Sequence, residues 1–122
     1  MSRPTWCAVT VAPTGTPLAP RTRVADRWWP RLVGLLATPA LAPGDGLLLV
    51  PCNAVHALGM RYAIDVAYLD RAGTVLHVTH GLRPGTVGWP VRGARAVLEL
   101  PEGALQAAGV RVGDRLEGLP PL

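Results

Sequence analysis

Short runs of apolar and β-branched residues recur along the chain, and most of them end at glycine, proline or aspartate. Runs of this length separated by turn residues are typical of β-strands. A pair of runs with a short glycine-containing turn between them predicts a hairpin. The predicted strands cover residues 5–11, 17–24, 46–50, 64–69, 74–80, 95–100 and 110–116. The strands at 64–69 and 74–80 form the predicted hairpin, and the range 110–116 also includes a turn.

Two segments have helical signals instead. Residues 27–37 follow Asp26, a good N-cap, and carry tryptophans and leucines at helical spacing, which predicts a stripe facing the core. Residues 101–108 begin with proline and are followed by Gly109, the usual arrangement at the two ends of a helix. The prediction is therefore one domain, residues 1–122, folded as a compact antiparallel β-sandwich or a partly open barrel with two short α-helices.

Residues 81–94 contain too many glycines and prolines for a regular element, so we expect a long surface loop there. Long ordered loops carry function more often than the elements they connect. Four residues in or beside this loop, Arg83, Trp89, Arg92 and Arg95, could grip a phosphate or stack on a base. A single aromatic residue, however, offers little surface for stacking bases, and the arginines are scattered along the whole chain. The pattern therefore disfavours nucleic-acid binding despite a net charge of +4.

Composition removes several kinds of chemistry. The sequence has no lysine, which excludes Schiff-base and Walker-type phosphate chemistry, and Ser2 is its one serine, which disfavours a serine hydrolase. We expect Cys7 and Cys52 to be reduced thiols. With no visible targeting segment and no apolar run long enough for a membrane span, the expected location is the cytoplasm.

Three residues with soft donor atoms, Cys52, His56 and Met60, are spaced four apart, which invites a copper or zinc interpretation. On a helix, residues four apart are neighbours. On a strand they are about 13 Å apart, so one ion could not bind all three. The neighbouring residues favour a strand, which leaves a core strand with one polar member as the simpler interpretation, and no metal or cofactor is expected.

Asp65 lies inside a strand of the predicted hairpin. If Leu69 pairs with Thr74, Asp65 is diagonal to His80 on the same face. A carboxylate beside an imidazole suits acid–base work or ligand binding, but it also suits a structural hydrogen bond. Arg61 could hold Asp65 instead, across the intervening turn.

The central motif C-x3-H-x3-M-R-Y-x-I-D-V-x-Y-L-D-x-x-G-x-V, together with A-V-L-E-L-P-E-G and G-V-R-V-G-D-R-L near the end, resembles the bacterial and archaeal family called domain of unknown function 192. The likeness covers about residues 25–116. It implies a compact β-sandwich with short helices and no established activity. Many relatives have another residue in place of Cys52, which argues against a required Cys–His–Met metal site. The matching positions are His56, Met60, Arg61, Asp65, Asp70, Pro84, Gly113 and Asp114.

Four functional interpretations follow. The first is a non-catalytic domain that binds a small ligand or a protein partner at the surface formed by the 60–65 turn and the 81–94 loop. The second is a small enzyme that uses a His/Asp acid–base pair on an anionic substrate, and the third is a soft-metal protein for copper or zinc. The fourth is a scaffolding component of a larger assembly. The binding residues expected for the first are His56, Met60, Arg61, Asp65, His80 and Arg83.

Overall fold

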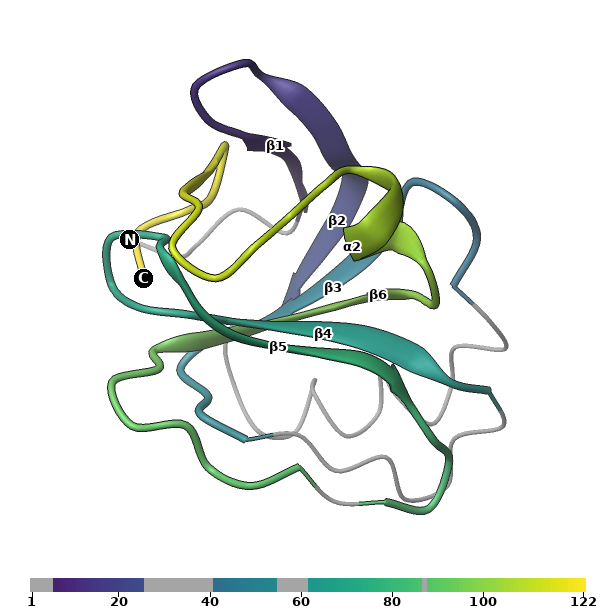
Figure 1. The fold of residues 1–122 in the computed structure, drawn as a ribbon. Helices are drawn as coiled ribbons and strands as arrows, with labels where there is room; N and C mark the ends of the chain where they lie inside the picture. Colours follow the sequence, from purple (N-terminus) through teal and green to yellow (C-terminus); the bar gives the residue numbers. More distant parts are fainter. Residues whose placement is uncertain (1–5, 26–40, 55–61, 87) are drawn as a thin grey trace.

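The computed structural model describes residues 6–25, 41–54, 62–86 and 88–122, which form a seven-stranded sheet and one short helix (Figure 1). The strands lie in the order β5-β4-β6-β3-β2-β1-β7. The prediction of a mainly β fold is confirmed. The elements are β1 (Trp6–Val11), β2 (Thr16–Ala25), β3 (Asp45–Leu49), β4 (Ile64–Leu69), β5 (Val75–Leu82), β6 (Ala96–Pro101), α2 (Ala104–Ala107) and β7 (Leu116–Glu117).

The pairing is antiparallel, as predicted, with one exception. Among the described strands, β2 and β3 run parallel, with Arg21 opposite Asp45 and Ala25 opposite Leu49, while the other neighbouring pairs are antiparallel. Parallel neighbours need a crossover of about a dozen residues or more. Residues 26–44 connect the two strands and are long enough for it. The side chain of Arg21 fixes the pair at one end by donating to Asp45, with 2.9 Å between Nε and Oδ1.

The sheet curls, and one end of it is joined edge to edge. β5 and β7 are the two edge strands, yet Thr74, just before β5, forms an isolated bridge with Arg115, just before β7. The backbone N–H of Val75 donates to the carbonyl of Asp114 at 2.8 Å, and the N–H of Leu116 donates to the carbonyl of Gly73 at 2.9 Å. Of the two predicted shapes, the partly open barrel is the one that describes the sheet.

The two faces of the sheet carry separate apolar clusters because side chains alternate along each strand. One face is the barrel interior, which packs Leu48, Leu98 and Leu100 against Leu105 of α2. The other face carries a second cluster, which we call the outer layer. Segment 83–95 passes below β4 and β5 in Figure 1, on the side opposite β1, β2 and α2. The outer layer consists of Ala25, Leu47, Leu49, Ile64, Val66, Tyr68 and Val97, with Leu41, Cys52, Tyr62, Leu82, Val91 and Ala94 packed against it.

The described residues contain one short helix where two were predicted. α2 begins later than predicted, because Pro101 ends β6 and the N-cap is Gly103, whose φ of 90° is a left-handed conformation that glycine adopts readily. The other predicted helix, residues 27–37, lies outside the described residues. No helix in the described ranges is long and apolar enough to cross a membrane.

Candidate functional site

Asp65 is the predicted site residue that the structure describes most completely. Its side chain is 1% exposed and points from β4 into the barrel interior. One carboxylate oxygen accepts the backbone N–H of Gly81 at 3.0 Å. The other accepts the N–H groups of Gly103 and Leu105, at 3.0 and 3.2 Å. Asp65 therefore joins β4, β5 and the first turn of α2, and it satisfies helix N–H groups that have no partner within the helix.

The hairpin brings His80 near Asp65, although in a different register from the predicted one. The distance between His80 Nδ1 and Asp65 Oδ2 is 4.0 Å, and the imidazole is 56% exposed. Leu69 pairs with Val75 and not with Thr74, and the register shifts twice along β4, next to Leu69 and between Ile64 and Val66. These irregularities account for the difference, because each adds residues to one strand that a pattern of alternation does not reveal.

Arg83, a further predicted binding residue, lies in an exposed turn after β5, where its carbonyl accepts the N–H and the hydroxyl of Thr86 at 3.3 and 2.6 Å. His56, Met60 and Arg61 lie outside the described residues. The surface expected at the 60–65 turn is therefore described only in part. Its acidic member, Asp65, is turned inward and bound to backbone groups.

The soft-donor set has one described member. The Cys52 thiol donates to the carbonyl of Ala54 at 2.9 Å and packs beside the outer layer. Within the described ranges, no group of three or more His, Cys, Asp and Glu side chains is arranged to hold a metal ion. Neither Cys7 nor Cys52 forms a disulfide, and burial raises the pKa of Cys7.

A pocket of about 440 Å³ lies between β5 and the segment that follows it, and we call it the β5 pocket. Trp89 on its rim is 87% exposed, although tryptophan is usually largely covered. Tyr68 lies on the floor, 5.6 Å from the ring of His77 between centroids, and hydrogen-bonds through its side chain with Thr79. The described lining residues are Tyr68, Leu76, His77, Thr79, Leu82, Gly88, Trp89, Pro90 and Val91.

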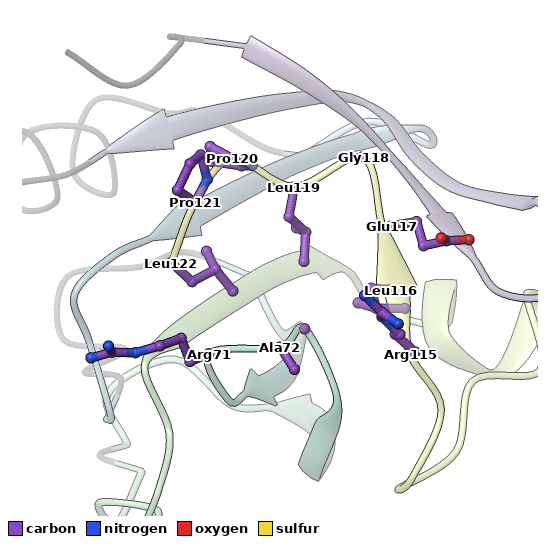
Figure 2. A pocket seen from close by; sticks show the side chains of 11 residues that line it. Arg71, Ala72, Arg115, Leu116, Glu117, Gly118, Leu119, Pro120, Pro121 and Leu122 are labelled. Carbon is purple, nitrogen blue, oxygen red and sulfur yellow. The ribbon is translucent and has the colours of Figure 1, made fainter. Parts of the chain in front are cut away.

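Figure 2 shows a second pocket, of about 430 Å³, between the turn that precedes β5 and the last residues of the chain. Arg71 and Arg115 lie on opposite sides of it, and the side chains of Leu119 and Leu122 point into the space between them. Both leucines also pack against the core cluster of the barrel interior. This pocket is thus an extension of the core at the joined end of the barrel, with two cations at its rim.

Glu99 is a buried acid that the sequence patterns did not single out. It lies on β6 in the middle of the sheet, 0% exposed, with Leu47 and Val66 as its strand partners. Neither carboxylate oxygen has a hydrogen-bond partner within the described structure. Burial raises the pKa of Glu99 to about 8. In the amino-acid sequence, the feature that could have pointed to this buried acid is a single charged residue within the otherwise apolar run 96–100.

Comparison with known proteins agrees with this fold. The family model for DUF192, described as uncharacterized ACR, matches residues 9–118. The chain belongs to the DUF192 family. The match begins earlier than the likeness found in the sequence, because it includes the second half of β1 and all of β2.

Several similar proteins carry the family name UPF0127. A UPF0127 protein of Pyrococcus furiosus is 39% identical over 101 residues, covering 78% of this chain and 84% of the relative. One from Pyrococcus abyssi is 33% identical over 103 residues, covering 80% and 85%.

Two crystal structures share the fold at 22% identity. One is a protein of unknown function from Novosphingobium aromaticivorans, with a TM-score of 0.77 over 90% of this chain and 83% of the other. The second, named as a candidate transcription regulator, is from Sinorhizobium meliloti and has a TM-score of 0.79 over 96% and 98%. At this identity the likeness concerns the fold.

Proposed function

We propose that this DUF192 protein is a non-catalytic domain that binds a small organic ligand in the β5 pocket. The observation that carries the proposal is the exposed Trp89 ring at a pocket that is also lined by Tyr68, His77 and Thr79. Small-molecule sites are typically concave, largely apolar and supplied with a few polar groups. The 81–94 loop, which was predicted to carry function, provides one wall of the β5 pocket. The proposed site therefore includes that loop but not the 60–65 turn.

The environment of Asp65 favours binding over catalysis by the predicted His/Asp pair. Its two oxygens already accept three backbone N–H groups, and His80 is 4.0 Å away, beyond hydrogen-bond distance. A carboxylate used in this way orients backbone and not an imidazole. The enzyme interpretation would need another base and an anion site near His80.

The experiment is a thermal-shift screen of ring-containing fragments, with neutral, cationic and anionic members, against the wild type, Trp89→Ala and Trp6→Ala. Trp6 is the matched control because it is 62% exposed on β1 and does not line the pocket. A fragment at 100 times its Kd stabilises the folded protein by about 2.7 kcal/mol, which corresponds to roughly 10 °C for a domain of this size.

We expect at least one fragment to raise the Tm of the wild type and of Trp6→Ala but not that of Trp89→Ala. Fragments that shift all three proteins equally would place binding elsewhere. A screen in which no fragment shifts the wild type would refute the proposed function.

A further inference from the structure

Glu99 is unusual because its carboxyl group is both completely buried and unpartnered among the described residues. Leaving a buried polar group without a hydrogen bond costs about 1–3 kcal/mol, and an ionised one costs more. Its raised pKa keeps the group protonated at neutral pH. A carboxylic acid held in this state is ready to ionise when a cation or a strong hydrogen-bond donor comes near.

The register of the strands places Glu99 close to the β5 pocket. Val66 pairs with Thr79 on one side and with Glu99 on the other, so these three residues form one row across β5, β4 and β6. Adjacent strands lie about 4.8 Å apart, so Thr79 and Glu99 are separated by roughly 10 Å. The pocket and the acid therefore lie on the same face of the sheet, two strands apart.

Tyr68 lies between the pocket and the acid. It pairs with Val97, which makes it the diagonal neighbour of Glu99, and diagonal neighbours are within reach of aromatic and long side chains. Tyr68 lines the pocket, and its hydroxyl group hydrogen-bonds with the side chain of Thr79, another lining residue. A phenol both accepts and donates a hydrogen bond, so Tyr68 can accept from a ligand and donate to Glu99.

The groups that line the pocket bear on the charge of the ligand. The described lining has aromatic and hydroxyl groups but no arginine, although the chain contains twelve. Aromatic faces attract cations. Among the described residues, Tyr62 and Tyr68 interact electrostatically with Glu99, while Cys52 and His77 lie near Tyr68. Burial raises the pKa of both tyrosines, and Glu99 contributes in each case.

We propose that the β5 pocket takes an organic primary ammonium ion, and that Glu99 holds it through Tyr68. This inference rests on the proposed function. The ammonium N–H donates to the Tyr68 oxygen, the Tyr68 hydroxyl donates to Glu99, and the Glu99 proton passes to the solvent. The ligand thus exchanges one positive charge for one proton, and Glu99 acts as a positioning residue.

The test is calorimetry with phenethylamine and its neutral analogue 2-phenylethanol as probes, on the wild type, Glu99→Gln and Trp89→Ala. Titrations at pH 7 in two buffers of different ionisation enthalpy give the number of protons released. We expect phenethylamine to release close to one proton from the wild type. We expect it to bind at least tenfold more weakly to Glu99→Gln, with no proton released. The alcohol should bind the wild type and Glu99→Gln equally.

Infrared spectroscopy of the wild type gives a second readout that does not depend on how Glu99→Gln folds. The band of a protonated carboxylic acid should disappear when phenethylamine is added and remain with the alcohol. Equal affinity of the amine for the wild type and Glu99→Gln, absence of binding by the amine, or an unchanged band would overturn this inference. If neutral fragments still require Trp89 in that case, the proposed function stands without it.

Discussion

Replacing Asp65 should destabilise the protein without altering the β5 pocket. The carboxylate accepts three backbone N–H groups from β5 and α2. A hydrogen bond to a charged group contributes about 1.5–3 kcal/mol, and contributions that share one acceptor do not simply add. Asp65→Asn keeps one acceptor oxygen and turns the amide NH2 group, a donor, toward at least one N–H. We expect it to lower the free energy of unfolding by about 3 kcal/mol.

Asp65→Ala removes every acceptor at this position and leaves the N–H groups of Gly81, Gly103 and Leu105 without the acceptor that they share. We expect a loss of about 5 kcal/mol, near the upper end of single substitutions. Urea denaturation followed by circular dichroism measures both values, and an unchanged m-value shows that the transition remains two-state. His80→Ala is the control. Because that imidazole is 56% exposed and lies 4.0 Å from the carboxylate, its removal should change stability by less than about 0.5 kcal/mol.

Two results would refute this account of Asp65. If Asp65→Asn changes the free energy of unfolding by less than about 0.5 kcal/mol, the three hydrogen bonds do not stabilise the fold. If the variant keeps its stability but no longer binds a fragment that the wild type binds, the carboxylate contacts a ligand, as the sequence pattern allowed.

Three further predictions concern other buried positions. The pKa of Glu99 is about 8 in the folded protein and 4.5 ordinarily, so its stabilising contribution is complete below pH 4.5 and is lost as the pH rises to about 8. In urea titrations, the free energy of unfolding of the wild type should fall by up to about 5 kcal/mol across that range relative to Glu99→Gln. Parallel pH profiles of the two proteins would contradict this. Gly118→Ala should lower the free energy of unfolding by more than about 3 kcal/mol, because a Cβ there would overlap the Ala8 carbonyl oxygen. Gly113 has a similarly positive φ but open space around it, so Gly113→Ala should lower it by only about 1–2 kcal/mol. Equal losses of Tm in the two variants would count against the overlap. Cys7 should react with iodoacetamide at pH 8 more slowly than a free cysteine, and an equal rate would show that burial does not raise its pKa.

The strands were predictable where the local pattern determines them. Residues 64–69 and 46–50 are short apolar runs bounded by turn residues, and they became β4 and, within a residue, β3. The parallel pairing of β2 with β3 was not predictable in this way. It depends on which strands become neighbours in space, and an isolated run looks the same in either orientation.

The site was harder to predict because its most important groups leave weak signals. Asp65 was identified as a polar residue in a buried strand, but its partners are backbone N–H groups, and these exist at nearly every position of a chain. Glu99 is conspicuous only once the structure shows that β6 is central and covered on both faces. The β5 pocket depends on how the loop folds back over β5, which composition does not specify.

The contacts that join the barrel edge to edge bear on how the chain folds during synthesis. Residues 113–117 supply both the partner of β1 and the hydrogen bonds to the start of β5, so one short segment covers part of the free edge of β1 and part of the edge strand β5. Translation releases β1 to β6 first, and at about 5–20 residues per second a nascent chain exposes both of those strand edges until this segment leaves the ribosome. Unpaired edges are templates for pairing with other chains. A chain that stalls before residue 113 would therefore keep both edges unpaired, and we expect it to aggregate more readily than the full chain.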